Sequence, residues 1–164
     1  MKTIRLRAGK ERSLLRQHPW VFEGSVDRGK ADAGETVRVE ASDGRFLAWG
    51  AYSPTSMIRV RAWTFDEAER VDEALLARRV ARALALRKRM PIDSDGVRLI
   101  HGEADGLPGL VVDRYADTLV AQFLSAAFRR AAIPEDQRHL CMLIIDEAHH
   151  IFDEQTEAIL TECR

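Results

Sequence analysis

Cysteine is scarce in this chain of 164 residues: only Cys141 and Cys163 occur. Two cysteines exclude a disulfide framework and a zinc site with four cysteine ligands in one copy, and such usage fits a reducing compartment. Long hydrophobic runs are also missing, since a stretch such as 140–145 falls far below the roughly 18 residues that a membrane span needs. No apolar signal core follows the charged start of the chain. We therefore expect a soluble, cytoplasmic protein without a membrane partner.

The chain also lacks a large excess of either charge, because it has 25 Lys and Arg residues and 26 Asp and Glu residues. This balance conceals a gradient along the chain. Residues 1–66 hold 12 basic and 8 acidic residues, residues 67–127 hold 9 and 10, and residues 128–164 hold 4 and 8. Such asymmetry indicates that the parts have different binding partners or different origins.

Alternating apolar and charged residues predict strands in the first part of the chain, because a strand with one buried face has a period of two residues. A helical turn is expected at 11–16, and Asp43-Gly44 is a hairpin turn signal. Closure would remove the edges that so short a sheet exposes, so we expect a small β-barrel. The predicted strands are about five in number and lie near residues 4–7, 20–22, 37–40, 45–49 and 58–63.

A helix is predicted over residues 72–89. Asp72 is a good N-cap, apolar residues recur at helical spacing behind it, and Pro91 stops the helix. Three strands with tight connections are predicted next, at 97–100, 110–113 and 118–124.

Several separated motifs, in a fixed order, carry a family resemblance. They are Gly9 to Gly24 with Gln17-His18-Pro19-Trp20 inside it, Gly50-Ala51-Tyr52-Ser53-Pro54, Arg59 to Phe65, Arg98 to Leu110 and Val112-Asp113-Arg114. Together they resemble the N-terminal half of the bacterial large-subunit rRNA cytosine-5 methyltransferases of the methyltransferase I type, over residues 1 to about 127. The resemblance implies an RNA-binding PUA barrel, then a small connecting domain, then a Rossmann-like domain that binds S-adenosylmethionine and carries the catalytic cysteine.

The expected fold class is therefore α+β. It comprises a small PUA-like β-barrel at 1–66, an incomplete α/β connecting domain at 67–133, and a strand-helix tail at 134–164 that is foreign to the family. The chain ends before the S-adenosylmethionine domain, has no Asp/Glu-x-Gly-x-Gly loop after a strand, and holds neither cysteine in a Pro-Cys or Cys-x-Cys context. Since attack on cytosine needs both a nucleophile and a methyl donor, we expect no cofactor in this chain and no methyl transfer by it alone.

Basic and aromatic side chains near the N-terminus are candidates for RNA binding. The cations would hold phosphates, and an aromatic ring would stack on one unpaired base. The alternative is that the charges are merely solvated and that Trp20 belongs to the barrel core. The resemblance favours RNA binding, with large-subunit rRNA as the partner. The candidates are Lys10, Arg12, Arg16, His18, Trp20, Arg5 and Arg7.

The tail departs from this pattern. Its apolar run before Asp146-Glu147 resembles the Walker B strand of P-loop ATPases, most of all the DNA-translocating, conjugation-type enzymes. That resemblance implies that Asp146 binds magnesium and that Glu147 contacts the attacking water, but only beside a phosphate-binding loop. Residues 24–30 have the Gly-x-x-x-x-Gly-Lys spacing yet lead toward a strand instead of a helix, so we interpret this spacing as chance.

Three functions stay open: the noncatalytic, RNA-binding part of a methyltransferase, a fragment of a P-loop ATPase, and a chimera with no selected activity. We expect residues 141–145 to pair with the sheet at 97–124, because an uncovered strand this apolar would promote aggregation. Glu147-x-x-His150 has no second such motif, so no metal site is predicted. Whether two copies form a homodimer is left open.

Overall fold

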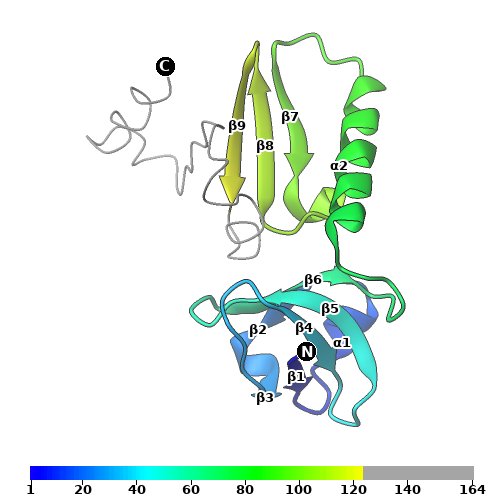
Figure 1. Cartoon of the computed structure of the whole chain (residues 1–164), viewed down its shortest axis with the longest axis vertical. Helices are drawn as coiled ribbons and strands as arrows, with labels where there is room; N and C mark the ends of the chain where they lie inside the picture. The colour runs from blue at the N-terminus through cyan, green and yellow to red at the C-terminus, as the bar shows by residue number, and fades with distance from the viewer. Residues whose placement is uncertain (124–164) are drawn as a thin grey trace, which may run out of the picture.

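The computed structural model describes residues 1–123, which form two β-sheets and one long helix (Figure 1). The expected tail at 134–164 and the pairing of residues 141–145 lie outside this range. In chain order the elements are β1 (Thr3–Leu6), α1 (Arg12–Leu15), β2 (Trp20–Phe22), the 3-10 helix η1 (Glu23–Ser25), β3 (Val26–Arg28), β4 (Thr36–Glu40), β5 (Phe46–Tyr52), β6 (Ile58–Thr64), α2 (Glu73–Lys88), β7 (Gly96–His101), the 3-10 helix η2 (Gly102–Asp105), β8 (Leu110–Tyr115) and β9 (Thr118–Phe123).

The first sheet is a six-stranded, curled half-barrel with the order β2-β6-β5-β4-β1-β3. Strands β1 and β4 are parallel, and all other neighbours are antiparallel. The expected barrel is thus present in a more open form, because the edge strands β2 and β3 do not pair with each other. The sequence pattern missed β3, since its three residues are too few to display a period of two.

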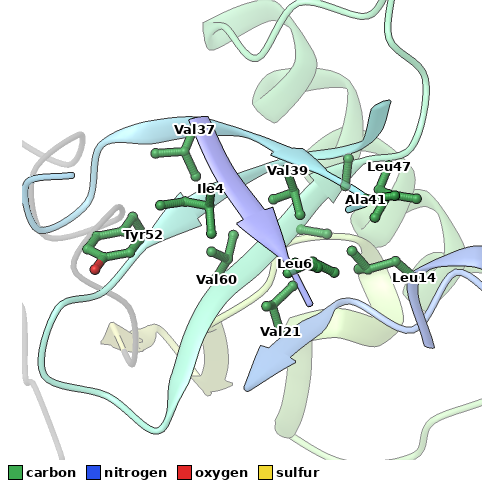
Figure 2. Close-up of a cluster of buried hydrophobic side chains, with 12 residues drawn as sticks. Ile4, Leu6, Leu14, Val21, Val37, Val39, Ala41, Leu47, Tyr52 and Val60 are labelled. Atoms are coloured by element: carbon green, nitrogen blue, oxygen red, sulfur yellow. The ribbon is translucent and has the colours of Figure 1, made fainter. Parts of the chain in front are cut away.

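The interior of the half-barrel is filled by the apolar members of the alternating pattern. Ile4, Val37, Val39 and Val60 are each 0% exposed, and Figure 2 shows their side chains gathered between the strands. Fully burying a side chain of this kind contributes roughly 1.5–3 kcal/mol, so these residues hold the curled sheet together. Because successive strand residues face opposite sides, the charged residues between them are directed away from this core.

The helix predicted at 72–89 is confirmed as α2. Its N-cap is formed as expected, because Asp72 Oδ1 accepts a hydrogen bond from the Leu75 backbone amide at 3.0 Å. Strands β7, β8 and β9 form a second sheet that is antiparallel throughout, which confirms the three predicted strands. Within residues 1–123, no helix has both the length and the apolar character needed to cross a bilayer.

A second apolar cluster joins the two sheets. Ala51 and Trp63 from the half-barrel are in the same buried cluster as Ala83 of α2 and Ile100 of β7. The half-barrel therefore buries residues on its outer side as well as in its interior. This contact positions the loop between β7 and β8 against the half-barrel.

Asp105 fixes that loop. Its two carboxylate oxygens accept hydrogen bonds from Arg87 Nη1 and Nη2, each at 2.7 Å, and Oδ2 also accepts from the His101 backbone amide at 2.7 Å. Burial raises the pKa of Asp105, but the hydrogen bonds from Arg87 and His101 outweigh it, so the pKa lies below its ordinary value. Glu103 belongs to the same 3-10 helix as Asp105, so it is thereby held at a fixed place beside the half-barrel.

Candidate nucleic-acid interface

The segment around α1 displays three cations. Leu14 is 2% exposed and anchors the short helix to the core, and Gln17 ends the segment with a φ of 59°, in the left-handed region. Lys10, Arg12 and Arg16 are exposed and form no ion pair with any residue of the described part of the chain. These three predicted site residues thus lie within one short segment, and no ion pair with a described residue compensates their charge, which leaves them available to phosphates.

Three aromatic rings follow one another at the edge strand β2: Trp20 and Phe22 belong to the strand, and His18 precedes it. The ring centroids of His18 and Trp20 lie 5.4 Å apart, those of Trp20 and Phe22 lie 6.3 Å apart, and both pairs are edge-to-face. These successive ring contacts join His18, Trp20 and Phe22 into one row, here called the aromatic row. Phe22 is 46% exposed, and α1 contacts β2, so the strand that carries the row contacts the short helix that carries Arg12.

The Trp20 side chain is held by a residue of η2, the 3-10 helix between strands β7 and β8 of the second sheet. Its indole Nε1 donates a hydrogen bond to Glu103 Oε1 at 2.7 Å, and Arg61 Nε lies 4.0 Å from the same oxygen. Burial lowers the pKa of Arg61, and the Glu103 carboxylate partly offsets this effect. Trp20 is half-buried and is not a member of the half-barrel core cluster, so the alternative of a core tryptophan does not describe it.

The structure separates Arg5 from the other candidates. Arg5 Nη2 lies 2.7 Å from Glu40 Oε2, and Arg38 Nε donates to Glu40 Oε1 at 2.9 Å. The hydrogen bond from Arg5 is the largest cause that holds the pKa of Glu40 below its ordinary value. The charge of Arg5 is therefore compensated by a neighbour, unlike the charges of the α1 segment.

Arg7 belongs to a second basic surface, which the sequence pattern did not indicate. Its Nε donates to the Val26 carbonyl oxygen at 3.1 Å, and its exposed side chain lines a groove of about 660 Å³ beside β3. This surface is called the β3 groove. It is lined by Arg7, Glu23, Val26, Asp27, Arg28, Gly29, Lys30, Tyr52, Pro54 and Arg59.

The two ATPase-like motifs lie in different parts of the chain. Asp146 and Glu147 lie outside the described residues. Residues 24–30, which have the phosphate-loop spacing, comprise part of η1, strand β3 and the start of the connection to strand β4. Residues 26–30 line the β3 groove. The interpretation of this spacing as chance is confirmed, because no helix opens there to bind a phosphate.

The curled sheet and its sequence place the first part of the chain in a known class of module. Residues 4–65 match the family model described as a PUA-like domain.

The similarity to curated proteins extends further. The chain is 52% identical over 127 residues to Ribosomal RNA large subunit methyltransferase I of Shewanella denitrificans, which covers 74% of this chain and 32% of that protein. It is 51% identical over 136 residues to the protein of the same name from Citrobacter koseri, covering 78% of this chain and 34% of that protein. The chain thus spans about a third of the length of the curated relatives it matches.

A solved structure described as a SAM-dependent methyltransferase from Streptococcus mutans has the same fold. It matches with a TM-score of 0.70 at 11% identity, over 99% of this chain and 38% of that chain. The residues described here do not fit a site for S-adenosylmethionine of the Rossmann type, because no loop among them with two glycines leads from a strand into an α-helix. Within residues 1–123 no cluster of His, Cys, Asp and Glu could hold a metal ion either.

Proposed function

We propose that the PUA-like domain of this chain binds RNA and serves as the substrate-targeting region of an S-adenosylmethionine-dependent methyltransferase that acts on cytosine in large-subunit rRNA. One observation supports it most: three exposed cations without ion pairs within residues 1–123 lie in or next to α1, which contacts the strand that carries two of the three rings of the aromatic row. The match of residues 4–65 to the PUA-like domain and the similarity to rRNA methyltransferases point to the same class of partner.

Each part of this surface has its own role in the proposal. Lys10, Arg12 and Arg16 bind phosphates, which positions the RNA without reading its sequence. The aromatic row stacks on an unpaired base, and the exposed rings of His18 and Phe22 are available for this contact. Arg5, paired with Glu40, is left out of the interface. Methyl transfer is assigned to none of the described residues.

The proposal is tested by fluorescence anisotropy with a labelled fragment of large-subunit rRNA at 0.1 M salt. We compare the wild type with the triple variant Lys10→Ala, Arg12→Ala, Arg16→Ala. Loss of three phosphate contacts with single-stranded RNA weakens binding by about a hundredfold at this salt concentration. Absence of binding by the wild type, or a triple variant that binds as well as the wild type, would refute the proposal.

A matched control removes three positive charges elsewhere. Arg70, Lys88 and Arg89 are exposed and form no ion pair with the residues the structure describes. The variant with alanine at these three positions should bind RNA within about threefold of the wild type. An equal loss in both triple variants would show that only total charge matters and would also contradict the proposed interface.

Two further expectations stay predictions. The ATPase role of Asp146 and Glu147 predicts that magnesium-ATP binds and that Asp146→Asn abolishes this binding, which isothermal titration calorimetry measures. A homodimer would appear in light scattering as twice the chain mass of 18.5 kDa.

A further inference from the structure

The β3 groove carries a net positive charge. Four cationic side chains line it, against the two carboxylates of Glu23 and Asp27, so the excess is two positive charges. The four are not equivalent. Arg59 is only 11% exposed, forms an ion pair with Glu23, and donates hydrogen bonds to the carbonyl oxygens of Ser53 and Pro54, so it is a structural wall of the groove.

Arg28 and Lys30 are the available cations of the groove. Both are exposed, and neither forms an ion pair within residues 1–123. Arg7 completes the set, because the hydrogen bond from its Nε to Val26 fixes its guanidinium group at the groove. A ligand in the β3 groove would therefore meet three cations that form no ion pair within residues 1–123, against the single carboxylate of Asp27.

The backbone fixes the positions of Arg28 and Lys30. Strand β3 pairs with β1, with Arg28 opposite Arg5, and the chain then turns at Gly29. Gly29 has a φ of +110°, and a Cβ atom there would lie 2.2 Å from the Thr3 carbonyl oxygen. Only glycine permits this close approach, so the backbone between Arg28 and Lys30 is held against β1. A backbone that is already fixed loses little further conformational entropy when these two side chains bind an anion.

We propose that the β3 groove binds the phosphate backbone of an RNA strand, as a contact separate from the α1 segment. The proposal rests on the RNA-binding function proposed above. Figure 2 shows Tyr52, which lines the β3 groove, at the end of the buried cluster opposite Leu14 of α1. One RNA molecule would thus contact the PUA-like domain at two ends, and the two contacts together would fix its orientation.

The test uses the double variant Arg28→Ala, Lys30→Ala and two labelled RNAs of unrelated sequence. Losing two phosphate contacts should weaken binding about 20-fold at 0.1 M salt. The factor should be the same for both RNAs, because phosphate contacts carry no sequence information. The control Lys88→Ala, Arg89→Ala removes the same charge from the C-terminal end of α2 and should change affinity less than twofold. Urea unfolding midpoints equal to that of the wild type show that the double variant is folded.

The outcomes separate the two proposals. If the α1 triple variant loses RNA binding and the groove double variant binds as the wild type does, the proposal for the β3 groove is overturned and the proposal for the α1 segment stands. Equal weakening in the double variant and its control also overturns it, since charge anywhere would then suffice. Competition by poly-glutamate that is stronger than competition by unlabelled RNA would assign the groove to an acidic peptide instead. A wild type that binds no RNA overturns both proposals.

Discussion

Replacing Glu103 with alanine tests how the second sheet holds the aromatic row. Glu103 lies on η2, 83 residues along the chain from Trp20, and its Oε1 accepts the indole Nε1 hydrogen bond at 2.7 Å. The same carboxylate is the acidic neighbour of the partly buried Arg61 guanidinium group. The variant removes both contacts at once, so we expect a loss of stability and a freely turning Trp20.

The magnitude follows from the environment of the pair. A hydrogen bond to a charged group contributes about 1.5–3 kcal/mol. The Glu103 side chain is 31% exposed, which places the value near the lower end, so Glu103→Ala should lower the free energy of unfolding by about 2 kcal/mol. For a chain of this size that corresponds to a fall in Tm of roughly 6 °C. Glu103→Gln keeps an acceptor oxygen and should lose only about half as much.

Urea denaturation followed by tryptophan fluorescence measures these values. A double-mutant cycle with Trp20→Phe isolates the coupling between the two side chains, which should be about 1–2 kcal/mol. If the free energy of unfolding of Glu103→Ala lies within about 0.5 kcal/mol of the wild-type value, or if the effects of the two substitutions are additive, the hydrogen bond does not hold Trp20 and the reasoning is refuted.

Two other predictions concern the scaffold. Leu14→Ala removes a side chain that is 2% exposed and should lower the free energy of unfolding, measured by urea denaturation, by about 2–4 kcal/mol. It should also weaken RNA binding through the α1 segment. The control Leu15→Ala, at a residue that is 57% exposed, should change neither the free energy of unfolding nor RNA affinity appreciably. The pKa of Asp105 lies below its ordinary value in the folded protein, so its ion pair with Arg87 stabilises the fold above about pH 4, and this contribution is lost as the pH falls further. The urea midpoint should therefore drop between pH 5 and 3 more steeply in the wild type than in Asp105→Asn. An equally steep drop in both proteins would contradict this prediction.

The elements that depend on local signals were predicted well. The periodic apolar residues of α2, its Asp72 cap, and the strands at 97–100 and 110–113 each involve residues close together in sequence, so one stretch of sequence contains the whole signal. Strand β3 was missed because it has only three residues and because its place depends on pairing with the distant strand β1. The open edges of the half-barrel likewise result from the pairing of distant strands.

The same distinction between local and long-range signals applies to the residues of the candidate site. The exposed cations of the α1 segment could be identified from helical spacing, because neither burial nor an ion pair from elsewhere in the described chain changes their state. Arg5 could not be assessed this way, since its partner Glu40 lies on β4. The anchoring of Trp20 by Glu103 depends on the packing of the second sheet against the half-barrel, and no local pattern records it.

The salt dependence of RNA binding tests the central claim most directly. Log affinity is plotted against log salt concentration for the wild type and for the variant with alanine at Lys10, Arg12 and Arg16. Each phosphate contact with single-stranded RNA contributes about 0.7 to the slope, so the variant should have a slope smaller in magnitude by about 2. Parallel lines for the two proteins would show that these side chains touch no phosphate and would contradict the account.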